Sequence, residues 1–224
     1  MTSEALQELA IQVSQAQTPA EFHHAYQGAL AAYDALNERT IEQTGARLAC
    51  RAGCSLCCSL RVEVYAHEVF LIADYVLASF PPEELAALKE RLAAHADKVL
   101  PLTPFEHATS NNRCPLLRAD GCCSVYAVRP QCCRRHHSQD LAACQFTYDH
   151  PADLEFPAAH QRELYRTLTE GMQQTAAVYA QLGYDTTIYE LGTALEETLS
   201  APESWQEWHN HMEAFVKASI TPSA

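Results

Sequence analysis

Apolar residues recur at helical spacing near the start of the chain. Thr18-Pro19-Ala20-Glu21 has the pattern of a capping box with proline at the first helical position. From Phe22 to Leu48, apolar side chains then recur mostly every three or four positions. A second helix is predicted from Ala66 to Ser79. A third is predicted from Glu83 to Val99, after the break at Pro81-Pro82.

The C-terminal third returns to helical spacing. Apolar and small positions step by three and four from Tyr165 to Leu182, and Gly183 stands where a glycine commonly follows a helix. Thr187-Ile188-Tyr189-Glu190 predicts a further capping box. A last helix is expected to carry four large side chains on one face, and core packing is favoured for them over a cofactor groove: Trp205, Trp208, Met212 and Phe215.

The segment between these helical parts is rich in proline and has no sustained period. Residues 100–157 are therefore expected to form loops with short turns, held in place by something such as a metal. The predicted fold is all-α, a helical bundle with a long irregular cysteine-rich metal-binding loop region. We expect one domain, 1–224, with a helical N-terminal part (1–49), a cysteine-cluster region (50–145) and a helical C-terminal part (155–218).

Composition narrows the class of protein. Hydrophobic residues make up 48% of the 224 residues and charged residues 19%, which is enough apolar material for a core. Fifteen basic against 28 acidic residues give a net charge of −13, which argues against a nucleic-acid partner. The N-terminus lacks the pattern of a signal peptide, and the most apolar run, Val69 to Phe80, is too short to span a bilayer. We therefore expect a cytoplasmic protein with no membrane partner.

Ten cysteines gather in the middle of the chain. In a reducing compartment, clustered thiols more often bind metal than form disulfides. Thiolates brought together in threes or fours hold Zn²⁺ or an iron–sulfur cluster. Two cysteine-rich loops meeting over a helical scaffold would supply them. The ten are Cys50, Cys54, Cys57, Cys58, Cys114, Cys122, Cys123, Cys132, Cys133 and Cys144.

The order of the cysteine motifs resembles a known family. Cys54-x-x-Cys57-Cys58 is followed by Cys114-Pro115-Leu116-Leu117, then by Cys123-Ser124-Val125-Tyr126, and then by Arg129-Pro130-Gln131-Cys132-Cys133-Arg134. Over about positions 50 to 145 this is similar to the CxxCxxCC family of zinc- or iron-chelating domains.

The resemblance implies metal chelation by six cysteines: Cys54, Cys57, Cys58, Cys114, Cys123 and Cys133. Cys50 departs from the family spacing by one residue, and it is a further candidate ligand as a partner for the knuckle. Cys122, Cys132 and Cys144 have no counterpart in the motif, and their roles stay open.

Positive charge gathers around the second cysteine loop. Arg113, Arg129 and Arg134 are predicted to face the cofactor, where they would neutralise a metal–thiolate centre. Two alternatives remain: pairing with acids on the helices, and binding of an anionic substrate. His136 or His137 could complete a Cys₃His site, although a histidine after a cysteine run more often lies outside the ligand set.

The sequence thus predicts a metal-binding protein that holds a zinc ion or an iron–sulfur cluster in thiolates of two cysteine-rich loops. One alternative is a metal-dependent or redox enzyme that acts on an anionic substrate. The other is a metal carrier or assembly factor with a protein client. The choice of metal, the number of metal sites and the oligomeric state stay open.

Overall fold

The computed structural model describes residues 1–155, 159–201 and 203–220. Residues 156–158 and 202 of the predicted C-terminal helical part lie outside the described residues. Within the described ranges, the larger helices are α1 (Ser3–Gln15), α2 (Pro19–Thr44), α3 (Ala66–Ser79), α4 (Pro82–Val99), α8 (Arg162–Gln181) and α9 (Leu191–Ser200). The shorter elements are η1 (Leu56–Ser59), β1 (Glu63–Val64), α5 (Pro104–Ala108), η2 (Tyr126–Val128), α6 (Gln131–Arg135), α7 (Leu141–Asp149), β2 (Tyr189–Glu190) and α10 (Ser204–His209).

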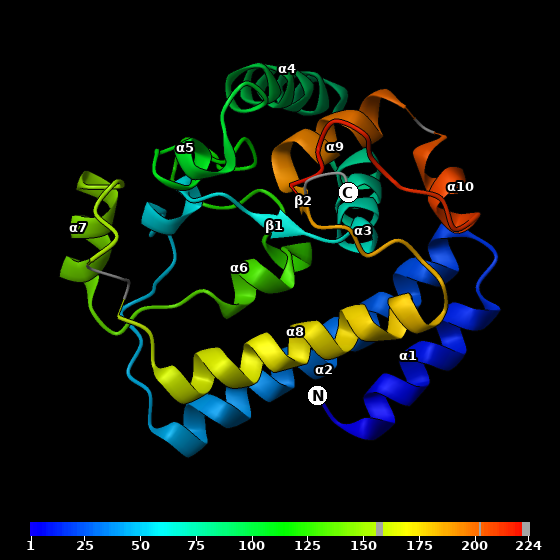
Figure 1. The fold of residues 1–224 in the computed structure, drawn as a ribbon, viewed down its shortest axis with the longest axis horizontal. Coiled ribbons are helices and arrows are strands. Elements are labelled where there is room, and N and C mark those ends of the chain that lie inside the picture. The colour runs from blue at the N-terminus through cyan, green and yellow to red at the C-terminus, as the bar shows by residue number, and fades with distance from the viewer. Residues whose placement is uncertain (156–158, 202, 221–224) are drawn as a thin grey trace.

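One layer of the fold consists of α1, α2 and α8, with the long helices α2 and α8 side by side (Figure 1). The Tyr33 hydroxyl on α2 donates to the Leu168 carbonyl on α8 at 3.0 Å. Gly171 lets the two helices come close, because a Cβ atom there would lie only 3.1 Å from the Leu36 side chain. This pair forms the base on which the cysteine region is placed.

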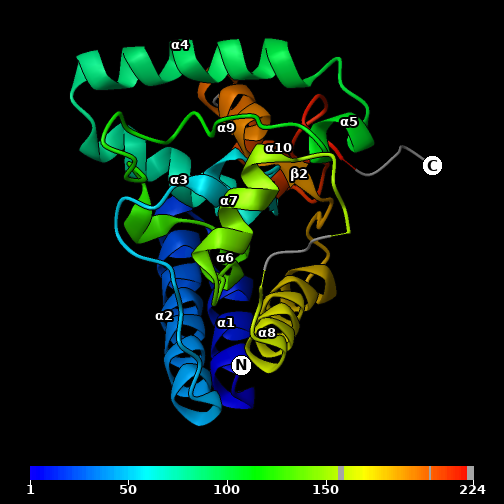
Figure 2. The ribbon, with the colours of Figure 1, turned by 90° about the vertical axis from the view of Figure 1, so that its left-hand side faces the viewer.

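The other layer is built from α3, α4 and α9, and Figure 2 shows α4 crossing the end of the molecule farthest from the tips of α2 and α8. The strands β1 and β2 pair antiparallel between the layers, with Glu63 opposite Glu190 and Val64 opposite Tyr189. The small sheet joins the chain just after the first cysteine loop to the start of α9.

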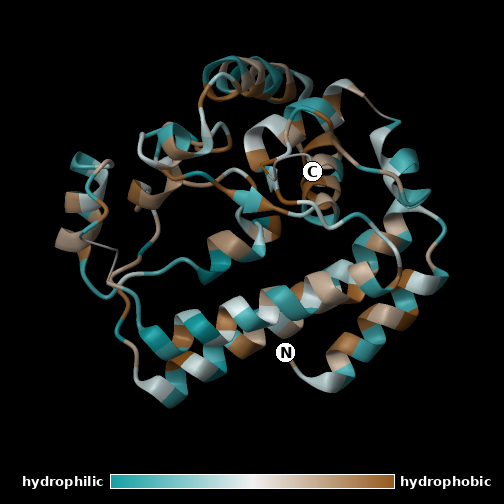
Figure 3. Ribbon diagram, in the orientation of Figure 1, coloured by the Kyte–Doolittle hydropathy of each residue, from teal (hydrophilic) through white to brown (hydrophobic). Residues whose placement is uncertain are grey.

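The core lies between these layers. Helix α3 is apolar on nearly every side, and nine of its 14 residues are buried (Figure 3). The largest fully buried side chains include Trp208, Tyr26, Tyr33, Tyr179 and Tyr189. Burial of an aromatic or large aliphatic side chain contributes about 1.5–3 kcal/mol. In the part of the chain that the structure describes, no helix is both long and apolar enough to cross a bilayer.

The local sequence signals are confirmed where they are strongest. The capping box at Thr18 and Glu21 forms at the start of α2, with Pro19 in the first turn. Helix α3 has the predicted bounds, and α4 begins one residue before the predicted Glu83. Gly183 follows α8 with a φ of +83°, a conformation that glycine adopts without strain. The all-α class is confirmed, since the only sheet among the described residues has two short strands.

Three local predictions are wrong. The predicted capping box at 187–190 does not form. Residues Tyr189 and Glu190 pair with β1 as strand β2, and Glu190 itself caps α9 by accepting from the Thr193 N–H. The last helix ends at His209, so Met212 and Phe215 lie beyond it, and Met212 is 48% exposed. The 100–157 segment contains more helix than expected, including the nine-residue α7.

A buried carboxylate ties the helical scaffold to the cysteine region. Glu68, in the first turn of α3, is 1% exposed. One of its oxygens accepts from the Tyr26 hydroxyl at 3.0 Å and from the Gln131 N–H at 2.8 Å, and the other accepts from the Tyr65 N–H at 3.0 Å. Gln131 is the first residue of α6, and its side-chain amide donates to Thr175 Oγ1 on α8 at 3.2 Å. Glu68 thus joins α2 and α3 to the helix that carries Cys132 and Cys133.

We predict that Glu68→Ala lowers the free energy of unfolding by about 3 kcal/mol or more, because it leaves two buried donors and one part-buried donor without an acceptor. Urea denaturation followed by circular dichroism measures the change. Glu90→Ala on the exposed face of α4 is the control, and it should change stability by less than about 0.5 kcal/mol. Equal effects of the two substitutions would refute a structural role for Glu68.

Candidate metal centre

The first cysteine loop is a turn followed by one turn of 3₁₀ helix. Gly53 has a φ of +78°, and the Cys54 N–H donates to the Arg51 carbonyl at 3.0 Å, so the chain reverses ahead of η1. Cys57 and Cys58 both lie on η1. Their thiols are hydrogen-bonded to each other, which shows that the helical turn brings adjacent cysteines together.

The second loop folds back on itself and contacts the first. Leu117 and Cys123 form an isolated antiparallel bridge, and the turn between them contains Gly121 with a φ of +80°. A Cβ atom at Gly121 would lie 2.9 Å from the Gly53 carbonyl oxygen. The two loops therefore meet at two glycines. Both positions have a positive φ that a larger residue adopts only with strain, and Gly121 also lacks space for a Cβ atom.

A backbone hydrogen bond fixes the third part of the cluster to the first. The Cys114 N–H donates to the Cys58 carbonyl at 2.8 Å, so the two cysteines are direct neighbours across the loops. The thiols of Cys132 and Cys133 on α6 are hydrogen-bonded to each other. Helix α6 is fixed in place by Glu68.

Four thiols from these segments form a mutually interacting group, which we term the central thiols: Cys57, Cys114, Cys123 and Cys133. Burial raises the pKa of Cys114 and of Cys123, and the charge of Cys133 raises both further. The hydrogen bond between Cys133 and Cys132 and then burial raise the pKa of Cys133, and the charge of Cys57 raises it further. The pKa of Cys57 is raised by its bond to Cys58 and by burial. Without a cation these groups stay protonated at neutral pH.

Several contacts act in the opposite direction and favour the thiolate form. The Leu116 N–H donates to the Cys114 sulfur, and the Val125 N–H donates to the Cys123 sulfur. The charge of Arg129 lowers the pKa of Cys57, Cys123 and Cys133. Backbone N–H groups and a guanidinium directed at sulfur are the surroundings that a negatively charged metal–thiolate centre requires.

The donor chemistry of the central thiols fits a thiophilic metal, but their side chains do not yet converge. Among the described residues, no three Cys, His, Asp or Glu side chains lie close enough together to hold one ion. Each cysteine has three staggered χ1 positions, so rotation about one bond moves its sulfur without moving the backbone. Binding of a metal by this group therefore requires such rotations.

The predicted arginines have different surroundings. The Arg134 guanidinium donates to the Arg129 and Ala127 carbonyls and pairs with Asp34 on α2. Arg113 donates to the Arg118 carbonyl at 2.8 Å. Arg129 lies over the Tyr126 ring at 4.0 Å, and of the three its charge acts on the most central thiols. Arg134 thus pairs with an acid on a helix, as one of the two alternatives predicts. Arg129 instead lies where its charge acts on the thiols that would hold a cofactor.

The two histidines after α6 also differ. Both ring nitrogens of His137 are used: Nδ1 bonds to the Arg135 carbonyl at 2.8 Å, and Nε2 accepts from the Gln161 N–H at 3.0 Å. His136 packs against His160, with ring centroids 5.0 Å apart. Burial, followed by the charges of His160 and His137, lowers the pKa of His136 to about 4. Because both ring nitrogens of His137 are hydrogen-bonded, His137 could ligate a metal only after losing one of these bonds.

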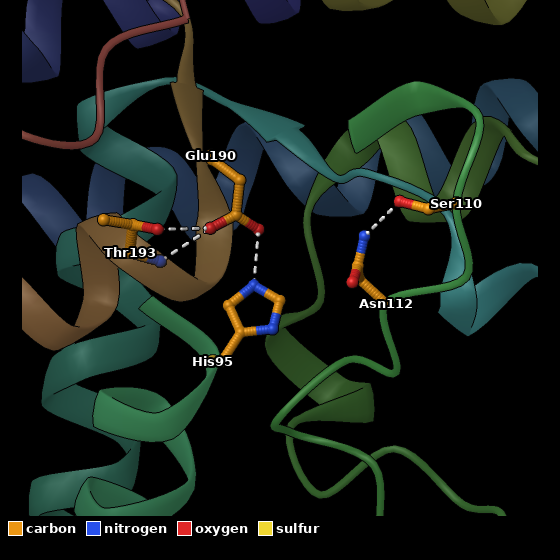
Figure 4. Close-up of polar contacts among 5 residues, drawn as sticks. All are labelled: His95, Ser110, Asn112, Glu190 and Thr193. Carbon is orange, nitrogen blue, oxygen red and sulfur yellow. Dashed lines mark hydrogen bonds and ion pairs between the residues drawn. The ribbon is translucent and has the colours of Figure 1, made fainter. Parts of the chain in front are cut away.

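A buried polar pair next to Cys114 has no counterpart in the sequence predictions (Figure 4). His95 Nε2 lies 3.2 Å from one Glu190 oxygen, and the other oxygen accepts from the Thr193 N–H at 2.7 Å and hydroxyl at 2.8 Å. Burial favours the neutral carboxyl, but the bonds and charge of His95 and the bonds from Thr193 lower the pKa of Glu190 overall. His95 lies in the middle of α4 without any local motif, so only the tertiary structure reveals the pair.

The pair lines a small cavity of about 10 Å³, which Cys114 also lines. Asn112 donates to the Ser110 hydroxyl at 2.9 Å, while its Oδ1 atom and His107 Nε2 are buried without a partner. Space for the His95 ring depends on Gly192, where a Cβ atom would lie 2.4 Å from His95 Cδ2.

We predict opposite effects for two glycine-to-alanine substitutions. Gly192→Ala should lower the free energy of unfolding by about 1–3 kcal/mol, because the added methyl group must displace His95 from Glu190. Gly28→Ala, on an exposed helix face with nothing within 4 Å, should raise it by about 0.5–1 kcal/mol. Chemical denaturation of both variants tests this, and a neutral Gly192→Ala variant would contradict the proposed packing.

Comparison with known proteins bears on the cysteine region. Residues 49–157, which contain all ten cysteines, match the family model CxxCxxCC, described as a putative zinc- or iron-chelating domain. Neither the curated proteins nor the solved structures include a match to the chain. The matched segment contains the two glycine-linked loops, α6 and each of the central thiols. Residues 49–157 of this chain thus match the CxxCxxCC family.

Proposed function

We propose that the chain chelates a zinc ion or an iron–sulfur cluster through thiolates of its two cysteine-rich loops. The observation that carries the proposal is the group of four central thiols from η1, the Cys114 loop, the Cys123 turn and α6, whose charges act on one another. The family match supports metal binding in general. The proposal names two candidates for the bound group, a zinc ion and an iron–sulfur cluster.

Cys57, Cys114, Cys123 and Cys133 would hold the group, and the neighbouring Cys54 and Cys58 are further candidates from the family motif. Four thiolates suit both zinc and an iron–sulfur core, so donor softness does not separate the two. Bound zinc would supply structural cross-links, and a bound iron–sulfur cluster would supply electron transfer. Arg129 would offset the negative charge in either case.

The clustering of free cysteines agrees with this proposal. All ten are free, although several are neighbours. Neighbouring free thiols persist in a reducing compartment, and we propose a cytoplasmic location on that ground. Because the thiols that would bind the metal must lose their protons, binding should release protons and weaken as the pH falls.

Purification without oxygen, followed by an absorption spectrum and elemental analysis, tests the proposed function. A brown protein with iron and acid-labile sulfide would identify a cluster, and a colourless protein with stoichiometric zinc would identify a zinc site. Cys114→Ser and Cys133→Ser should each lose most of this metal, because each removes one of four soft ligands.

Cys122→Ser is the matched control. Cys122 directly precedes Cys123 in the same loop, its N–H donates to Asp120 Oδ1 at 2.9 Å, and it has no counterpart in the family motif. This variant should keep the wild-type metal content. A wild-type protein free of zinc and iron, or a Cys133→Ser variant with full metal content, would overturn the proposal.

A further inference from the structure

Four polar side chains from separate segments of the chain line the small cavity beside Cys114: His95 on α4, His107 on α5, Asn112, and Glu190 on β2. The volume of the cavity is about 10 Å³. A cavity of this size has space for one water molecule and for nothing larger. The wall of the cavity therefore decides whether such a small molecule is bound there.

The orientation of the Asn112 amide is fixed by Ser110. The Ser110 hydroxyl donates its single proton to the Glu106 carbonyl at 2.7 Å, so its oxygen accepts from the Asn112 side-chain N–H at 2.9 Å. Figure 4 shows the Asn112 amide nitrogen facing Ser110 and the amide oxygen turned away from it. Asn112 is 3% exposed, and its Oδ1 atom is a buried acceptor without a partner among the described residues.

His107 contributes a second buried polar atom to the same cavity. The residue is 6% exposed, and its Nε2 atom has no partner among the described residues. Burial lowers the pKa of His107, so the ring is neutral at pH 7, and Nε2 either donates or accepts a single hydrogen bond. A buried polar atom that makes no hydrogen bond is costly. Asn112 and His107 therefore both need a partner that fits into the cavity.

The carboxylate in the wall already has its own donors. One Glu190 oxygen lies 3.2 Å from His95 Nε2, and the other accepts from the Thr193 N–H and hydroxyl. The wall thus offers no unpaired carboxylate to a cation. A neutral molecule that both donates and accepts hydrogen bonds meets the needs of Asn112 and His107.

We propose that the cavity binds one water molecule, which donates to Asn112 Oδ1 and bridges this atom to His107 Nε2. Water suits both positions, because it can donate to an acceptor and can either donate to or accept from the ring nitrogen. Buried waters typically occupy polar sites of this size, where they satisfy otherwise unpaired groups. The inference goes beyond the proposed function and does not rest on it, since the water site is the same whichever group Cys114 binds.

The bridge attaches the segment ahead of Cys114 to α5. The backbone of this segment is bonded to the first cysteine loop, since the Asn112 N–H donates to the Ser59 carbonyl at 3.0 Å and the Cys114 N–H donates to the Cys58 carbonyl at 2.8 Å. The water adds an attachment through the Asn112 side chain. The segment is thereby held from both sides, and Cys114 with it.

Crystal structures of the full-length wild-type protein and of His107→Phe, at a resolution that shows ordered water, test the site. The wild-type cavity should contain one water within about 2.7–3.2 Å of both His107 Nε2 and Asn112 Oδ1. The His107→Phe variant keeps an aromatic ring but lacks Nε2, and its cavity should lose the water. A wild-type cavity that is empty or holds a metal ion, or a water that remains in His107→Phe, would overturn the proposal.

Amide hydrogen exchange measures the attachment in solution. His107→Phe should speed the exchange of the Asn112 and Cys114 amides about tenfold, because the segment loses the hydrogen bond that the water supplies. His24→Phe, on the exposed face of α2, is the matched control and should leave both rates unchanged. Unchanged rates in His107→Phe would refute the attachment. The metal content of the same wild-type sample reports on the proposed function separately, and the wild-type crystal structure decides the water site even if His107→Phe does not fold.

Discussion

The buried carboxylate of Glu68 is the interaction on which the placement of the cysteine region depends. A carboxylate at 1% exposure is costly unless its oxygens are hydrogen-bonded, and Glu68 accepts from three donors on or next to three different helices. Burial raises the pKa of Glu68, while its hydrogen bonds and the nearby charge of Arg134 lower it in part. The carboxylate thus orients α6, and α6 carries Cys132 and Cys133 to the loops.

The protein around the central thiols favours their ionised form only in part. Burial and mutual repulsion oppose ionisation of the central thiols, while backbone N–H groups and Arg129 favour it. A bound cation would favour the thiolate form, because its positive charge stabilises thiolates directly. The chain has a net charge of −13, so its composition alone predicts no positive charge beside the central thiols. The Arg129 guanidinium supplies that positive charge.

The sequence predicts those features that depend on neighbours in the chain. The capping box at Thr18, the bounds of α3 and the glycine after α8 each rest on residues within a few positions of one another, and each is confirmed. The family resemblance is confirmed too, because its motif is a fixed order of short segments.

Features that depend on distant residues could not be predicted in this way. The 187–190 segment has the composition of a cap, but pairing with β1 and burial of Tyr189 turn it into a strand. The His95–Glu190 pair joins residues on α4 and β2, and no local pattern marks either one. The order of elements gives no sign of these contacts.

The central claim is that sulfur atoms from separate segments of the chain bind one metal centre. X-ray absorption at the edge of the bound metal tests this claim most directly. The account predicts a first shell dominated by sulfur, at about 2.3 Å if the metal is zinc. A first shell dominated by nitrogen and oxygen atoms would contradict it.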